Sequence, residues 1–208
     1  MKQVVCLLAL CVTALLGVWL VTESQKKIGV ISAIEARRSI RAYKDTPVER
    51  EKLQLIAECG VWAPNAMGKQ NWEVRIVDSK EWIDGATAAY LKAVEGTGKV
   101  DYMLTPTFKN IFRNASAVIF VGAPDGLFAG EDVGCLGQNM MLAATELGLG
   151  TCFLGSAQMM LADPAMEEYL QSLGFSEGYK LRYALAVGYP DETPDAKPRD
   201  MSKIKFVE

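Results

Sequence analysis

The sequence predicts an α+β fold in which a small central sheet is flanked by long helices. Two observations carry this prediction. Stretches with apolar residues at helical spacing make up much of the chain, and they alternate with only a few short segments of strand-like composition. The chain has 208 residues, of which 50% are apolar, and this is enough for one well-packed domain. We expect that domain to cover residues 25–208.

An apolar run without any charged residue occupies residues 4–21, directly after Lys2. A run of this length is typical of a secretory signal peptide or of an N-terminal membrane anchor. We assign residues 1–24 to such a segment, and the choice between cleavage and a retained anchor stays open. With the usual topology, either alternative predicts a protein that is exported or anchored to the membrane, in the bacterial periplasm or cell envelope.

Two helices are expected in the first part of the domain. Residues 28–38 carry apolar residues at helical spacing. The next helix has a complete start signature: Thr46 as the cap, Pro47 at the first helical position and Glu49 completing a capping box. We expect Pro64 to end this second helix.

The middle of the chain alternates between strand and helix. Residues 71–79 alternate in polarity like a strand, and residues 80–96 have the pattern of a helix. Residues 96–114 are expected to form an irregular linker with a short helical piece near residues 108–113. A continuous apolar run at residues 115–124 is typical of a central strand that is covered on both faces.

The last part of the domain begins with a long helix over residues 130–150, which is apolar enough to lie in the core or at a dimer interface. A short strand or extended loop follows at residues 151–156. Residues 163–174 predict a helix with Asp163 as its cap, and residues 179–190 predict the last strand. The remaining tail is polar and contains prolines.

Composition excludes several classes of function. The net charge is −3 and no long basic run is present, so a nucleic-acid partner is not expected. The sequence has no histidine, which excludes histidine-based nucleophilic catalysis and histidine metal sites. Cys59, Cys135 and Cys152 are scattered without a CxxC pair, and we interpret them as small buried hydrophobic residues. The less favoured alternative is that one of them is reactive. The chemistry must therefore come from other side chains or from a cofactor, and no metal site is expected.

Three arginines, at positions 37, 38 and 41, surround Ser39 where the first helix is expected to end. One interpretation, which spacing alone favours, is a helix end whose cations complement the helix dipole. The other is a cradle for an anion, because arginine forks bind phosphate through two parallel hydrogen bonds. A second basic pair, Lys197 and Arg199, lies in the tail and would have to converge on the same anion.

Four motifs together resemble the FMN-dependent nitroreductase family. They are "RRSIRAY" followed closely by "DTPV", "APNAMGKQNWEV", "ELGLGTCFLGS" and "ALAVGYPDETPDAKPRD", they occur in the order of the family, and they span about residues 31–200. The resemblance implies a nitroreductase-like fold that forms an obligate homodimer with FMN at the dimer interface. The resemblance also favours the interpretation of residues 37–41 as an anion cradle over their interpretation as a helix end.

The resemblance implies a set of cofactor-binding residues: Arg37, Arg38, Ser39, Arg41, Pro64, Asn65, Ala66, Leu154, Gly155, Lys197 and Arg199. The first three and the tail pair would hold the FMN phosphate and ribityl chain. Arg41 would lie near the pyrimidine end of the ring. Residues 64–66 would reach the flavin from the partner subunit, and residues 154–155 would lie beside flavin N5.

The resemblance further implies an FMN-dependent oxidoreductase that passes two electrons from NADH or NADPH, through flavin N5, to a nitroaromatic, a quinone or an activated alkene. No catalytic side chain is expected, which fits the absence of histidine. Alternatives are other flavin chemistry on this scaffold, such as reductive dehalogenation or flavin-fragmenting oxidation, and a non-catalytic flavin-binding electron-relay protein. Gly68 stands where many members have asparagine, which is a hint of a member that has lost its cofactor.

Overall fold

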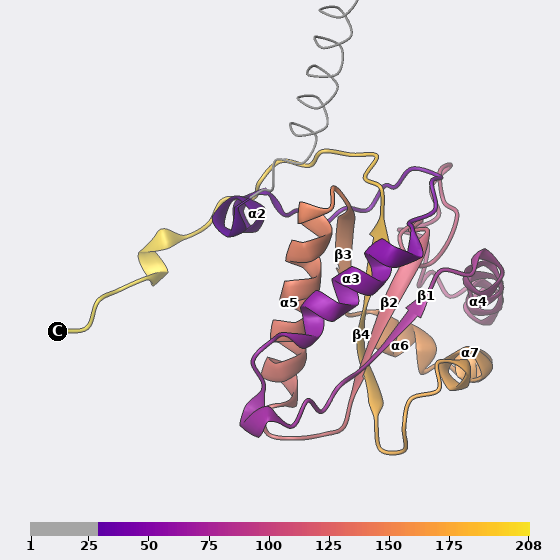
Figure 1. The fold of residues 1–208 in the computed structure, drawn as a ribbon. Coiled ribbons are helices and arrows are strands. Elements are labelled where there is room, and N and C mark those ends of the chain that lie inside the picture. Colours follow the sequence, from indigo (N-terminus) through magenta and orange to yellow (C-terminus); the bar gives the residue numbers. More distant parts are fainter. Residues whose placement is uncertain (1–28) are drawn as a thin grey trace, which may run out of the picture.

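The computed structural model describes residues 29–208, and these form a four-stranded sheet with helices on both faces (Figure 1). Across the sheet the order is β1 (Glu73–Val77), β2 (Ala117–Ala123), β4 (Lys180–Gly188) and β3 (Gly150–Leu154). Each neighbouring pair is antiparallel. The predicted α+β class with a small central sheet is therefore confirmed.

Strand β2 lies in the middle of the core, as its continuous apolar composition predicted. All seven of its residues are buried. Because successive side chains of a strand point to opposite faces, Val118 and Phe120 join one hydrophobic cluster while Ile119 and Val121 join another. The sheet therefore separates two cores, and each core is closed by its own set of helices.

The helices divide between the two faces of the sheet (Figure 1). One face is covered by α3 (Arg50–Val61) and α5 (Ala129–Glu146). The other is covered by α4 (Lys80–Ala93), α6 (Ala157–Leu161) and α7 (Glu167–Ser172). The remaining helical pieces are α2 (Val30–Ala36), which contacts α5, and the 3₁₀ turns η1 (Ala66–Gly68), η2 (Pro164–Met166) and η3 (Met201–Lys203).

The predicted start of the second helix is wrong. Helix α3 begins at Arg50, with Glu49 as its N-cap residue and without a side-chain cap. Val48 is buried in the core, which keeps the chain before the helix extended. The Glu49 carboxylate accepts a hydrogen bond from the Tyr189 hydroxyl instead, at 2.7 Å. A tertiary contact has therefore replaced the local capping box that the sequence predicted.

The short helix expected near residues 108–113 does not form, and turns occupy this segment. Asn110 and Asn114 bind neighbouring backbone groups with their side chains, and such bonds compete with helix formation. Farther along, the Asp163 carboxylate accepts a hydrogen bond from the Ala165 N–H at 3.0 Å, so the predicted cap is confirmed. The expected helix after it is divided into η2 and α7.

Among residues 29–208, no helix is both long and apolar enough to cross a membrane. The apolar run at residues 4–21 lies outside the described residues, and so does the choice between a signal peptide and an anchor. The division into residues 1–24 and 25–208 stays a prediction.

The backbone of Gly150, at the start of β3, lies very close to Ile40 in the segment before α3. This close packing predicts how a substitution at Gly150 changes stability. A Cβ added to Gly150 would lie 2.7 Å from Ile40 Cγ1, which is too short for any real contact. We expect Gly150→Ala to lower the free energy of unfolding by about 1–3 kcal/mol through overpacking, measured by urea denaturation. Gly126→Ala is the control, because its Cβ would meet its nearest neighbour at 3.9 Å. Equal stability of the two variants would contradict the packing argument.

Candidate functional site

The arginine motif lies along the edge strand β3. Helix α2 ends at Ala36, and Ser39 forms a parallel bridge to Thr151. The Ile40 N–H donates to the Thr151 carbonyl at 2.9 Å. The buried Tyr43 hydroxyl donates to the Ile40 carbonyl at 2.7 Å, and burial raises its pKa so that it stays protonated. The backbone that carries the arginines is therefore fixed to the sheet.

The C-terminal tail is tied to the same segment. The Asp191 N–H donates to the Ala42 carbonyl at 3.0 Å. The Glu192 carboxylate accepts hydrogen bonds from two backbone groups, the Arg41 N–H and the Ala42 N–H. Two regions that are far apart in the sequence, the first motif and the last motif, therefore meet at the edge of the sheet.

Beyond Glu192 the tail runs past α2 and leaves the body of the domain (Figure 1). Lys197 and Arg199 are exposed, and the Arg199 guanidinium donates to the Lys197 carbonyl at 2.9 Å. Within residues 29–208, no hydrogen bond or ion pair joins this pair to residues 37–41. The structure of a single chain therefore does not bring the two predicted basic clusters into contact.

The arginines of the first motif differ in their surroundings. The Arg38 guanidinium donates to the Glu35 carbonyl at 2.5 Å and to the Arg37 carbonyl at 2.9 Å, so it caps the end of α2. The Arg41 guanidinium donates to the Ser39 carbonyl at 3.1 Å. Among the ion pairs of the described residues, none involves an arginine of this motif. The helix-end interpretation therefore describes Arg38, while the charges of Arg37 and Arg41 stay available to an anion.

The thiol of Cys152 reports how positive charge gathers at β3. Burial raises the pKa of this thiol, and so does the negative charge of Glu192, whereas the charges of Arg41, Arg113 and Arg37 act in the opposite direction. Three guanidinium groups therefore lie close enough to influence one buried point in the strand. Arg113 was missed in the sequence analysis, because it belongs to no motif and its position depends on how the 96–114 loop folds.

Strand β3 also carries Leu154, and Gly155 follows directly after it; these are the two residues that the sequence analysis placed beside flavin N5. Leu154 is its last residue and is buried, whereas Gly155 is exposed, and a Cβ added there would meet no atom within 4 Å. The buried Thr151 hydroxyl, beside Ser39, has no hydrogen-bond partner among the described residues. An unsatisfied hydroxyl group and open space therefore lie on this strand, and arginines that form no ion pair within the described residues lie beside it.

The predicted segment Pro64–Ala66 is held at the other end of α5. The Ala66 N–H donates at 2.9 Å to Asp132, in the first turn of that helix, and Asn65 Oδ1 accepts from the Gln70 N–H at 2.8 Å. Gly68 has a φ of 64°, a left-handed conformation that glycine and asparagine adopt more readily than other residues. Glycine at this position therefore keeps the backbone path and removes only a side-chain amide.

Helix α5 separates the two groups of predicted site residues. It has 18 residues and is therefore about 27 Å long. Pro64–Ala66 lies at its first turn, while the arginine motif packs beside Gly150, just after its end (Figure 1). The structure brings Arg37, Ser39 and Arg41 to the same strand as Leu154 and places the other segment away from them.

The cysteine interpretation is correct for one residue of the three. Cys152 is buried, Cys59 is half-buried and Cys135 is exposed. Cys135 lies on the outer face of α5, and apolarity alone did not reveal which side of this helix faces the sheet.

Comparison with known proteins decides the family. The profile described as the nitroreductase family matches residues 34–189, which is more than half of the chain. This chain belongs to the nitroreductase family.

Two solved structures match this chain along nearly their whole length. A nitroreductase from Desulfitobacterium hafniense, solved with bound FMN, is 30% identical, covers 86% of this chain and 98% of its own, and has a TM-score of 0.76. One from Bacteroides fragilis, also with bound FMN, is 28% identical, with coverages of 86% and 99% and a TM-score of 0.72. The NADPH-flavin oxidoreductase of Vibrio harveyi is 28% identical over 81% of this chain and 69% of its own. The predicted family and its nitroreductase-like fold are confirmed.

The expected location of this nitroreductase, exported or anchored in the cell envelope, is wrong. The relatives that match it are flavin-dependent and NAD(P)H-dependent reductases whose names carry no indication of export. The expectation rested on composition alone, at residues 4–21.

The environment of Cys152 predicts that its thiol is unreactive in the folded protein. We expect iodoacetamide at pH 8 to leave Cys152 unlabelled in the folded protein and to label it in urea. Cys152 is buried, and its raised pKa lowers the fraction of reactive thiolate at that pH. Peptide mapping by mass spectrometry measures the labelling of Cys152 under both conditions. Equal labelling in the folded protein and in urea would show that the burial of Cys152 is wrong.

Proposed function

We propose that this nitroreductase oxidises NADH or NADPH and reduces a small-molecule acceptor, which is a nitroaromatic, a quinone or an activated alkene. The observation that carries the proposal is the group of arginines beside β3 that form no ion pair within the described residues, in a fold whose relatives bind FMN. The class predicted from the sequence, an NAD(P)H-dependent flavin oxidoreductase with FMN, is confirmed by the relatives. The choice of acceptor is our proposal.

The residues present fit FMN as a ligand. A phosphate needs cations and hydroxyl donors, and Arg37 and Ser39 offer both at the end of α2, next to the unsatisfied Thr151 hydroxyl. No carboxylate of the described residues forms an ion pair with Arg37 or Arg41. When bound, FMN supplies the two-electron transfer between donor and acceptor. Arg38 serves this site indirectly, because its guanidinium holds the end of α2 in place.

Arg41 and the end of β3 are proposed to act on the ring of the cofactor. A fixed guanidinium at the pyrimidine end stabilises negative charge there. Arg41 is held for this by its backbone N–H, which donates to Glu192, and by its guanidinium, which donates to the Ser39 carbonyl. Leu154 and Gly155 are proposed to present backbone N–H groups near N5. The open space at Gly155 supports this assignment, since a planar ring needs an approach without a side chain. No proton-transferring side chain is required, and the chain has no histidine.

Lys197 and Arg199 are proposed to complete the phosphate site. The tail is anchored at Glu192, and the five residues from there to Lys197 have a reach of about 17 Å. This reach is sufficient for Lys197 to fold back toward the arginine motif. Neither side chain forms an ion pair with a carboxylate of the described residues, which leaves both charges available.

A homodimer is proposed because one chain separates the groups that the site needs. In a twofold dimer built along α5, Pro64–Ala66 of one subunit can meet the arginine motif of the other. The outer face of α5 carries Gly134 and Cys135 in exposed positions, which allows close helix packing. Apolar side chains lie exposed nearby, with Trp62 at 86% and Ile31 at 72%. Exposed apolar surface of this kind is typical of an interface.

The phosphate assignment predicts how variants retain FMN. We expect Arg37→Ala and Lys197→Ala each to raise the dissociation constant for FMN about tenfold or more, because each loses a charge-assisted hydrogen bond to the phosphate. Fluorescence titration of the FMN-free protein measures this constant. Lys92→Ala, which removes an exposed cation on α4, is the control and should bind FMN like the wild type. Unchanged binding in both site variants would rule out the assignment.

The shared site predicts complementation between two defective subunits. We expect a heterodimer of Arg37→Ala and Asn65→Ala subunits, purified through two different tags, to recover about half of the wild-type activity, since one of its two sites is intact. NAD(P)H oxidation with menadione or a nitroaromatic measures this recovery.

The control for complementation is a heterodimer of Arg37→Ala and Ser39→Ala subunits. Both changes then fall in the arginine motif, each site carries one of them, and no recovery is expected. If the first heterodimer is as inactive as this control, residues 64–66 serve the site of their own chain.

A further inference from the structure

A small cavity of about 240 Å³ lies between the arginine motif and the 96–114 loop. Its walls include two arginines and two threonines, together with an aromatic ring and an amide: Arg41, Arg113, Thr105, Thr107, Tyr102 and Asn114. None of the residues that line it is acidic. The cavity therefore offers positive charge and hydrogen-bond donors. The Glu192 carboxylate lies beside it, because it accepts from the backbone N–H groups of Arg41 and Ala42, but among the described residues it forms no ion pair with either arginine of the cavity.

The backbone of Arg113 adopts an unfavourable conformation. Its φ is 60° and that of Asn114 is 64°, so two consecutive residues other than glycine adopt the left-handed conformation. Such conformations persist only where the surroundings enforce them, and they gather at functional sites. The Arg113 guanidinium lies over the Tyr102 ring, 5.3 Å from its centre, and forms no ion pair with a carboxylate of the described chain.

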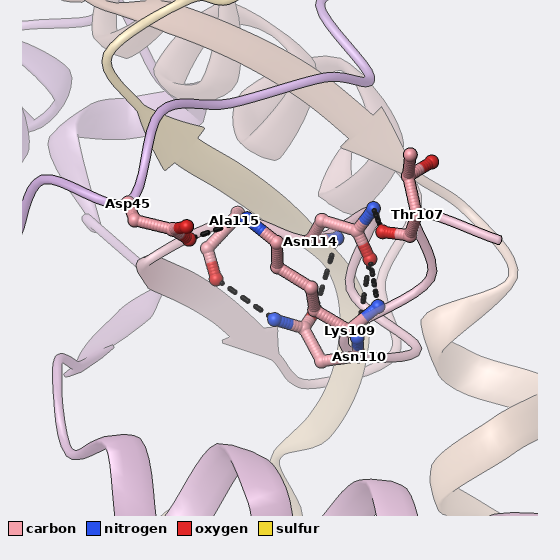
Figure 2. A network of polar contacts seen from close by, with 6 residues as sticks. All are labelled: Asp45, Thr107, Lys109, Asn110, Asn114 and Ala115. Carbon is pink, nitrogen blue, oxygen red and sulfur yellow. Dashed lines mark hydrogen bonds and ion pairs between the residues drawn. The ribbon is translucent and has the colours of Figure 1, made fainter.

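A network of amide side chains enforces this conformation (Figure 2). Asn114 Oδ1 accepts from the backbone N–H groups of Lys109 and Asn110, at 2.7 and 3.1 Å. Asn110 Oδ1 in turn accepts from the N–H groups of Phe112 and Asn114, at 3.0 and 3.1 Å. The Asn110 amide also donates to the Ala115 carbonyl at 3.1 Å. The turn that presents Arg113 is thus held from both sides.

The neighbouring cation in this turn has a different environment. The Lys109 ammonium group is paired with the Asp45 carboxylate (Figure 2). Among the cations near Cys152, Arg41 and Arg113 counteract the effect of burial on the pKa of its thiol more strongly than Arg37 does. Their two charges therefore act on the same region. Neither guanidinium forms an ion pair with a carboxylate of the described chain, and the Glu192 carboxylate counteracts their effect on the thiol only in part.

We propose that this cavity binds the carboxylate of an electron acceptor between Arg41 and Arg113, so that the enzyme prefers acidic acceptors, such as aromatic acids that carry a reducible group. The proposal rests on the proposed function, because Arg41 is expected beside the flavin ring. The cavity is smaller than the pockets that hold a whole cofactor, and its size suits one end of a small molecule. Arg113 is then the residue that determines specificity, and Asn110 and Asn114 position it.

Binding of a matched pair of ligands tests the proposal without turnover. The FMN-loaded full-length protein is titrated with 4-nitrobenzoate and with its neutral isostere 4-nitrobenzamide, and the flavin spectrum reports binding. We expect wild type to bind the acid about tenfold more tightly, Arg113→Gln to lose this preference, and Arg113→Lys to keep part of it. Lys92→Gln removes an exposed cation on α4 and should leave both dissociation constants unchanged. Equal binding of the acid by wild type and Arg113→Gln would overturn the proposal.

A second variant separates recognition from folding. Glycine adopts a positive φ without strain, so Arg113→Gly is expected to fold with an unchanged or higher melting temperature and to lose the preference for the acid. If it keeps the preference, Arg113 serves only to pack on Tyr102 and the proposal fails.

Kinetics distinguish the two anionic compounds that an arginine pair can recognise. If Arg113→Gln raises the KM for NADPH and leaves the KM for NADH and the binding of 4-nitrobenzoate unchanged, the cavity binds the phosphate of the donor and the proposal fails. NAD(P)H oxidation with 4-nitrobenzamide tests the proposed function separately. If the enzyme reduces this neutral acceptor but does not bind the acid more tightly, the proposed function is supported and the proposed carboxylate site is refuted. A different result would be that the acid binds in an Arg113-dependent way but that NAD(P)H does not reduce the protein. This result would refute the proposed function and would support the anion site.

Discussion

The pairing of residues 39–43 with the sheet is the constraint on which the site depends. An edge strand presents unpaired backbone groups, and here the segment after α2 covers the outer edge of β3. The contact leaves no room for side chains on its sheet side: a Cβ at Gly150 or at Gly188 would lie 2.7 Å from Ile40 or Tyr43. One strip of extended chain therefore fixes the arginines, and its bridge to Pro190 brings the tail to the same edge.

Helix α5 packs into the core and also separates the two groups of proposed cofactor residues. Its inner face, with Leu136 and Met140, fills the core under the sheet, while its two ends hold the two groups of proposed cofactor residues. A helix is stiff on this scale, so no small rearrangement of one chain can bring its ends together. If the proposed assignment of both groups to one site is correct, the packing that stabilises the monomer also makes a second subunit necessary for a complete site.

Local signals in the sequence predicted what local interactions decide. The run that became β2 and the Asp163 cap needed no knowledge of distant residues. The failures occurred where tertiary contacts prevailed: the burial of Val48 moved the start of α3, and the amides of Asn110 and Asn114 replaced a helix by turns. The arginine motif was found through its resemblance to a family. Arg113 could not be found, because its role depends on a left-handed turn that no spacing rule encodes.

The distribution of charge explains why the site has to be filled. The protein has more acidic than basic residues, yet its ion pairs within residues 29–208 lie elsewhere, for example between Arg50 and Asp78 and between Lys180 and Asp125. Surface pairs of this kind contribute only about 0–1 kcal/mol each. The arginines beside β3 form no ion pair within the described residues, and the Glu192 carboxylate offsets their charge only in part, so an anion that binds between them would lower their mutual repulsion. Any anion that binds the folded state alone must then stabilise it in proportion to the logarithm of its concentration, so binding at this edge and folding stability are coupled.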